Sequence, residues 1–206
     1  MRHAATGDEK GALAEYQSKR DFRVTNEPEG RLRETNEHRF VIQKHAASTL
    51  HYDFRLECAG VLMSWAVPKG PSTDPSQRRL ALRTEDHPID YLDFEGVIPE
   101  GQYGAGAVIV WDIGLYRNMT RDNDGAEIPL ERALEQGHAK VSLEGRKLRG
   151  GYALTRMGTG TQWLLVKMRD EHADSRRNLT RMERTSALSG RTVEEVMKAG
   201  VTVAHD

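Results

Sequence analysis

The residues with the clearest potential for chemistry are His51, Asp53 and Arg55, which alternate with three large apolar residues in the segment 51–56. This alternation predicts a β-strand, because successive side chains of a strand point to opposite faces. One face of the strand then carries an imidazole, a carboxylate and a guanidinium in a row. The other face is apolar, and we expect it to pack on a hydrophobic core.

A second predicted strand lies within the segment 39–45 and ends at His45. If the two strands pair, His45 approaches His51 and Asp53, and two histidines with one carboxylate and an open position match a divalent-metal site. Arg55 would stand beside the metal, and a phosphate between them would relieve the repulsion of the two positive charges. Polar residues that alternate along a strand also mark ordinary solvated sheet faces, so the spacing leaves both interpretations open.

The composition excludes several classes of protein. The chain has 206 residues, a formal net charge of −1, 37% hydrophobic residues and 30% charged residues, which suits one domain with a substantial core. The balanced charge predicts no extensive non-specific binding to DNA. Cys58 is the only cysteine, which excludes an internal disulfide and a cysteine-rich zinc site. No hydrophobic run approaches the length of a membrane span and the first residues lack a signal-peptide core, so we expect a cytoplasmic protein.

The elements that must position these residues are mostly short strands. Their number predicts a mainly β fold, a compact β-barrel of about eight strands with a few short peripheral helices. Helical patterns cover 11–19, 129–136 and 192–198, the last opening with a capping box. The glycine-rich segment 94–106 could cradle phosphate through backbone N–H groups. It lacks the lysine and following helix of a nucleotide-binding loop, so a tight corner of the barrel is the favoured interpretation.

The distribution of polar residues divides the chain into three expected parts. Residues 1–15 are an N-terminal tail, 16–173 form the barrel domain, and 174–206 are a polar linker with a short C-terminal helix.

Several motifs together resemble a known family. They are Arg20-Asp-Phe, Glu27-Pro, Gln43-Lys-His45, His51-x-Asp53-x-Arg55, Ser64-Trp-Ala-Val-Pro-Lys69-Gly-Pro, Glu85-Asp-His87-Pro-x-Asp-Tyr91 and Phe94-Glu-Gly-x-Ile-Pro-Glu-Gly-Gln-Tyr-Gly-Ala-Gly106. This set resembles the 3′-phosphoesterase domain of bacterial DNA ligase D. The resemblance covers about residues 16–173.

The resemblance implies a β-barrel enzyme that processes 3′ ends of DNA, or of DNA tipped with RNA, during DNA repair and non-homologous end joining. A phosphodiesterase step would remove a terminal ribonucleoside, and a phosphomonoesterase step would remove the remaining 3′-phosphate to leave a 3′-OH. Mn²⁺ is the implied cofactor, and Zn²⁺ or Co²⁺ stay open because the ligands include no thiolate. The expected partner is a separate DNA ligase or end-joining factor, and the expected state is a monomer in a prokaryotic cell.

The resemblance also assigns expected roles to residues. The implied metal ligands are His45, His51 and Asp53. The positions that surround the scissile phosphate are matched by Arg55, Lys69, Arg79, His87 and Tyr91. Further positions that the family needs are matched by Gln43, Arg20, Asp21 and Glu27, so the N-terminal arm is expected to fold over the site. His87 is expected to be a protonated donor to the phosphate or the leaving oxygen, since a nearby anion raises the pKa of a histidine.

Two other functions stay open at this point. The same donor set would suit a metal phosphatase that acts on small phosphate esters. It would also suit a non-catalytic adaptor that binds nucleic-acid ends and uses its metal structurally.

Overall fold

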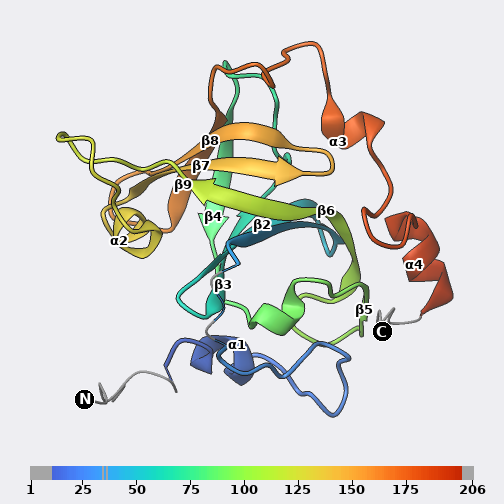
Figure 1. Ribbon diagram of the computed structural model, residues 1–206. Helices are drawn as coiled ribbons and strands as arrows, with labels where there is room; N and C mark the ends of the chain where they lie inside the picture. Colours follow the sequence, from blue (N-terminus) through green and yellow to red (C-terminus); the bar gives the residue numbers. More distant parts are fainter. Residues whose placement is uncertain (1–10, 34, 36, 201–206) are drawn as a thin grey trace.

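The computed structural model describes residues 11–33, 35 and 37–200 (Figure 1). Residues 1–10 of the expected tail and 201–206 of the expected C-terminal part lie outside the described residues. The strands are β1 (Arg39–Ala46), β2 (Leu50–Cys58), β3 (Val61–Val67), β4 (Arg78–Arg83), β5 (Gly96–Ile98), β6 (Gly106–Asn118), β7 (His138–Gly145), β8 (Arg149–Arg156) and β9 (Gln162–Lys167). The helices are α1 (Ala14–Ser18), α2 (Leu130–Glu135), α3 (Leu179–Met182) and α4 (Val193–Ala199), with one 3₁₀ turn, η1 (Ile89–Tyr91).

The strands form one antiparallel sheet that closes on itself. Their order in the sheet is β1-β2-β3-β4-β9-β8-β7-β6-β5, and an additional pairing of β1 with β6 completes the ring. Strand β6 can serve three neighbours because it is long: its first residues pair with β5 and its last with β7. The closed ring therefore has eight strands with β5 as an appendage, which confirms the expected barrel.

The barrel interior is apolar and rich in aromatic side chains. The apolar face of β2 packs there as predicted, with Phe54 1% exposed beside Trp65, which is fully buried. Trp111 of β6, on the other side of β1, also belongs to this core. Because these residues point inward, His51, Asp53 and Arg55 on the alternate positions of β2 point out of the barrel.

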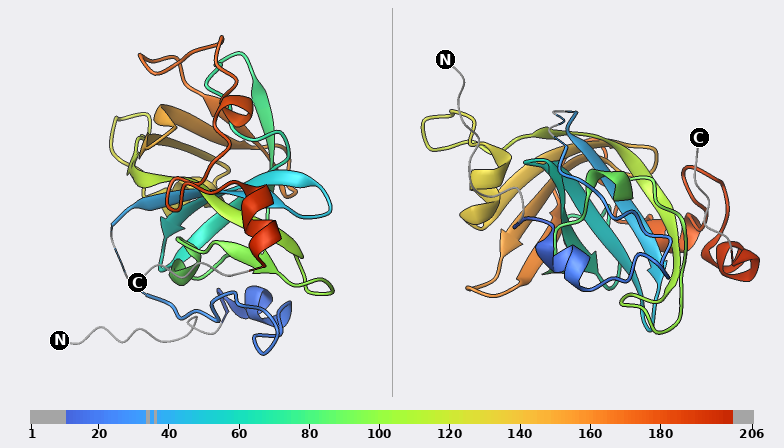
Figure 2. Two further views of the ribbon diagram at one scale, coloured as in Figure 1. Left: turned by 90° about the vertical axis from the view of Figure 1, so that its right-hand side faces the viewer. Right: turned by 90° about the horizontal axis from the view of Figure 1, so that it is seen from below.

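A second apolar cluster covers part of that outer face. Tyr16 of α1 is fully buried against η1 and against outward-facing residues of β1 and β6 such as Val41. Figure 2 shows α1 and η1 lying together on this side of the sheet, in the view from below. The expectation that the N-terminal arm folds over the barrel is thus confirmed, and the arm brings polar residues of its own to the outer face.

The segment 174–192, expected to be a polar linker, lies against the barrel. Trp111 donates its indole N–H to the carbonyl of Glu183 at 2.7 Å, and Ser186 donates its hydroxyl to Glu95. Helix α4 begins after Thr192 with the predicted capping box and buries its apolar side on β6. The domain boundary itself stays a prediction. Across the residues that the structure describes, no helix has the length and apolarity needed to cross a membrane.

Candidate metal centre and phosphate site

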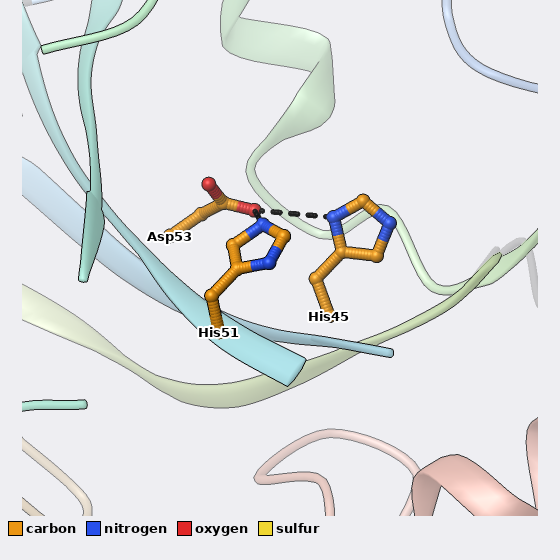
Figure 3. Close-up of side chains that lie close together, drawn as sticks. All are labelled: His45, His51 and Asp53. Carbon is orange, nitrogen blue, oxygen red and sulfur yellow. Dashed lines mark ion pairs between the residues drawn. The ribbon is translucent and has the colours of Figure 1, made fainter. Parts of the chain in front are cut away.

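The pairing of β1 with β2 gathers the three proposed metal ligands. The antiparallel register sets His45 opposite His51, with Asp53 two residues further along β2. His45 Nδ1 lies 3.5 Å and His51 Nε2 lies 3.6 Å from Asp53 Oδ2. Figure 3 shows both imidazoles turned toward this carboxylate. Among the described residues, this is the only group of three such side chains able to share an ion.

Backbone carbonyls fix the tautomer of each histidine. His45 Nε2 lies 2.8 Å from Gly104 O, and His51 Nδ1 lies 2.9 Å from Thr49 O. A carbonyl can only accept, so each ring carries its N–H on that nitrogen and a neutral ring directs its lone pair toward Asp53. Histidines that hold metals in proteins commonly donate their other N–H in this manner.

The donor set fits a divalent cation. The three donor atoms all lie within 4.8 Å of one another. An ion bound at about 2.1 Å from each donor places neighbouring donors about 3.0–3.5 Å apart, close to the 3.5 and 3.6 Å between the histidine nitrogens and Asp53 Oδ2. Burial alone would raise the pKa of Asp53, but the charge of Arg55 and hydrogen bonds from the two histidines hold that pKa well below its usual range. Asp53 is therefore a carboxylate at neutral pH.

Arg55 is held rigidly beside these ligands. Its Nε donates to Gln43 Oε1 at 2.8 Å, and its Nη1 donates to Ser64 Oγ at 2.8 Å. The remaining nitrogen, Nη2, lies 3.4 Å from Asp53 Oδ2. Gln43 is itself fixed, because its amide donates to the carbonyls of Tyr91 and Phe94 at 3.0 Å each. Its protein partners thus fix the orientation of the guanidinium toward Asp53.

His87 lies between two guanidinium groups. Arg55 Nη1 is 2.9 Å from its Nδ1, and Arg20 Nη2 is 3.4 Å from its Nε2. Burial and then the charges of Arg55 and Arg20 lower the pKa of His87 well below its usual range. The nearest charges in the free site are therefore cations, and the donor role expected for His87 beside a bound phosphate stays a prediction.

The N-terminal arm supplies Arg20 and its supporting carboxylates. Arg20 Nε donates to Glu27 Oε1 at 2.8 Å, and its Nη1 lies 3.3 Å from Glu85 Oε1. The Tyr91 hydroxyl also donates to Glu27 Oε1, at 3.0 Å. Burial and the charge of Glu27 raise the pKa of Tyr91 well above its usual range, so this hydroxyl stays protonated.

These side chains surround one cavity of about 280 Å³. Its lining consists of Arg20, His45, Ala47, His51, Asp53, Arg55, Ala66, Thr84, Glu85, His87, Tyr91, Ile98, Tyr103 and Gly104. The cavity therefore combines a donor set that fits a divalent cation with two fixed guanidinium groups, which is an arrangement suited to an anion held against a cation.

Comparison with known proteins identifies the family. The family model described as the DNA ligase D 3′-phosphoesterase domain matches residues 43–156. The chain belongs to this family. A curated relative from Pseudomonas aeruginosa, named multifunctional non-homologous end joining protein LigD, is 50% identical over 189 residues, covering 88% of this chain and 22% of the relative.

Two further relatives support the assignment. The multifunctional non-homologous end joining DNA repair protein LigD of Mycobacterium tuberculosis is 42% identical over 161 residues, 77% of this chain and 20% of the relative. The corresponding protein of Mycolicibacterium smegmatis is 43% identical over 162 residues, 77% of this chain and 21% of the relative. The chain thus spans about a fifth of the length of the curated relatives it matches.

Not every residue expected from the 3′-phosphoesterase resemblance lines the cavity. Gln43 and Glu27 lie behind it, as the partners of Arg55, Arg20 and Tyr91. The side chain of Asp21 pairs with Arg23 at 2.7 Å instead of reaching the metal ligands.

Lys69 and Arg79 are not part of the cavity lining. Lys69 is exposed on the turn that follows β3. Arg79 lines a separate hollow of about 180 Å³ together with residues of the segment 175–179, and its Nε is buried without a hydrogen-bond partner. The roles implied for these two residues at the scissile phosphate stay predictions.

The structure adds three residues that our sequence interpretation did not assign to the 3′-phosphoesterase site. Ser64 accepts from Arg55, Glu85 pairs with Arg20, and Tyr103 lines the cavity from the loop between β5 and β6. Ser64, Glu85 and Tyr103 all lie within motifs that carry the family resemblance. Only the folded arrangement shows which of the many residues in those motifs reach the cavity.

Proposed function

We propose that this 3′-phosphoesterase domain is a metal-dependent enzyme that processes the 3′ ends of nucleic acids. In this proposal it removes 3′-terminal ribonucleosides as a phosphodiesterase and 3′-phosphates as a phosphomonoesterase, leaving 3′-OH ends. The proposed cofactor is Mn²⁺, with Zn²⁺ or Co²⁺ as alternatives, held by His45, His51 and Asp53.

The observation that carries the proposal is the contact between Arg55 and a proposed metal ligand. Arg55 Nη2 lies 3.4 Å from Asp53 Oδ2, so a guanidinium N–H and an ion on Asp53 would both be within reach of one phosphate group. Arg55 is 3% exposed. Besides the contact of Nη2 with Asp53, its Nε and Nη1 donate hydrogen bonds to Gln43 and Ser64. Donors fixed in this way need little reorganisation when charge develops on the phosphoryl oxygens, which is often a large catalytic term.

Residues around the proposed ion would orient the phosphate and donate a proton to the leaving oxygen. A bound divalent cation would polarise a phosphoryl oxygen and offset its charge. Arg55 and Arg20 would orient the non-bridging oxygens. A phosphate dianion would offset the two guanidinium charges beside His87, so the pKa of His87 would rise on binding and the ring could then donate to the leaving oxygen.

The nucleic-acid substrate is proposed from the relatives, whose names describe them as non-homologous end joining proteins. By the same inference, the domain works at DNA ends together with a DNA ligase or another end-joining factor. A formal net charge of −1 suits recognition of a terminus through a few local contacts better than coverage of a long duplex.

The test is a gel assay on a primer–template duplex whose primer ends in a 3′-phosphate, with Mn²⁺ or with EDTA. We expect Mn²⁺-dependent conversion to a 3′-OH, reduced in His51→Ala by more than about 100-fold, since losing even outer contacts of a metal ligand costs about 10–100-fold. His138→Ala is the matched control, because His138 is exposed and bonds only to Thr155.

Two further substrates separate the alternatives. A primer that ends in one ribonucleotide tests the phosphodiesterase step. Comparable turnover of p-nitrophenyl phosphate and the 3′-phosphorylated primer would instead favour a small-ester phosphatase. Binding of both primers without conversion, with any divalent metal, would refute catalysis and support an end-binding adaptor.

A further inference from the structure

Tyr103 is an exposed aromatic residue at the rim of the cavity. Its side chain is 51% exposed, and it is the only aromatic among the large hydrophobic side chains exposed in the described part of the chain. It nevertheless lines the same cavity as His45, Asp53 and Arg55. An aromatic ring that is open to solvent beside an anion site can stack against a flat ligand.

The loop that carries Tyr103 is tied to the metal centre. The neighbouring Gly104 accepts a hydrogen bond from His45 Nε2 at 2.8 Å through its carbonyl. On the other side, Gln102 Oε1 accepts from the backbone N–H of Asp21 at 3.4 Å. The ring is therefore anchored, through its adjacent residues, to a proposed metal ligand and to the arm, and its distance from the phosphate site is set by the fold.

Cations of the arm lie over the ring of Tyr103. Lys19 Nζ is 4.8 Å and Arg20 Cζ is 5.7 Å from the centroid of Tyr103. Both cations also pair with Glu85. Sites that bind single-stranded nucleic acid place cationic side chains close to an aromatic platform for a base.

The cavity is small compared with sites that enclose a whole ligand. Its volume of about 280 Å³ is below the roughly 300–1,000 Å³ of sites that enclose a whole small ligand. With a phosphate held beside Asp53 and Arg55, the base of the same nucleotide can extend to the rim of the cavity, where Tyr103 lies.

We propose that Tyr103 forms a nucleobase subsite, in which its ring stacks on the base of the nucleotide that carries the 3′-phosphate. This inference rests on the proposed function. Because every base presents a π-face, the subsite distinguishes nucleotides from phosphate esters that lack a base, without selecting one base over another.

The test compares two primers that differ only at the terminal nucleotide. Both end in a 3′-phosphate, and the terminal residue is either thymidine or a tetrahydrofuran abasic analogue. Base stacking on an aromatic residue is worth about 5–150-fold in affinity, so wild type should favour the thymidine primer in kcat/KM by a factor in this range. In Tyr103→Ala the ratio of the two kcat/KM values should fall toward one, whereas Tyr103→Phe keeps it.

A matched control and a binding measurement complete the test. Leu115→Ala removes an equally exposed apolar side chain, also 51% exposed, on β6, and should leave the ratio unchanged. In EDTA, a strand ending in 2-aminopurine 3′-phosphate should lose fluorescence on saturation with wild type or Tyr103→Phe, and retain it with Tyr103→Ala.

The outcomes separate this inference from the proposed function. A ratio that stays at the wild-type value in Tyr103→Ala, or fluorescence that wild type does not quench, would overturn the subsite. If wild type converts neither primer, the proposed catalysis fails, and the fluorescence measurement alone then decides whether Tyr103 stacks on a base.

Discussion

Replacing Gln43 with methionine tests whether the buried amide orients Arg55. Gln43 is fully buried and does not line the cavity, yet it accepts from Arg55 Nε at 2.8 Å and donates to the carbonyls of Tyr91 and Phe94 at 3.0 Å each. Methionine has a similar volume and can form none of these bonds with comparable strength. The substitution therefore removes polar contacts without opening a large void.

The magnitude follows from the three bonds. A hydrogen bond to a charged group contributes about 1.5–3 kcal/mol and a neutral one about 0.5–1.5 kcal/mol, so Gln43→Met should destabilise the fold by about 2.5–6 kcal/mol. With a urea dependence of about 2 kcal/mol per molar, the unfolding midpoint should fall by about 1–3 M. If the bond to Arg55 also sets the position of the guanidinium, its loss should lower kcat by about 10–100-fold at one factor of ten per about 1.4 kcal/mol.

The assay measures both quantities on the same variants. Urea unfolding gives the midpoint, and initial rates on the 3′-phosphorylated primer with Mn²⁺ give kcat. Gln43→Glu separates the two effects, because a carboxylate still accepts from Arg55 but offers no donor to the two carbonyls. We expect it to recover most of kcat while remaining destabilised. Gln136→Met, at an exposed position after α2, should change neither quantity.

Either of two results would refute this reasoning. A midpoint within about 0.3 M of wild type would show that the three bonds contribute little net stability. A destabilised Gln43→Met with undiminished kcat in its folded population would show that Ser64 and His87 suffice to hold Arg55.

Three further outcomes are expected. Mn²⁺ at about 100 times its Kd should stabilise the wild type by about 2.7 kcal/mol and raise Tm by about 5–11 °C in scanning fluorimetry, and an equal rise in Asp53→Asn would place the ion elsewhere. Burial lowers the pKa of His51, but the hydrogen bond and charge of Asp53 outweigh burial and raise it above 6.5. Protons should therefore compete with the metal as the pH falls through this raised pKa, and a calorimetric affinity that is constant from about pH 8 to about pH 6 would contradict the assignment. Ser186→Ala removes the donor to Glu95 and the acceptor for two backbone N–H groups. It should therefore destabilise the fold by about 1–3 kcal/mol and speed limited proteolysis within 174–192. Unchanged cleavage would show that the Ser186 contacts do not hold this segment.

The sequence by itself determined the strand face that carries the proposed metal ligands. Side chains alternate along a strand with a period of two, so His51, Asp53 and Arg55 had to share a face whatever the rest of the chain did. A short connection then brought His45 back opposite His51 in an antiparallel pair. These relations are local, so spacing predicted the shared face of β2 and made the pairing of the two strands a hypothesis. The number of short strands predicted the barrel, and the motifs predicted the family.

Only the tertiary structure decided the direction of the pKa shift of His87 and which residues line the cavity. The pKa of His87 is lowered because folding buries the ring and then places guanidinium groups from β2 and from the arm beside it. Arg79 lies away from the cavity lining, and Tyr103, from a loop predicted to be a corner, stands at the rim. Electrostatic energy depends on distances through space between residues far apart in the chain, and no periodicity along the sequence encodes those distances.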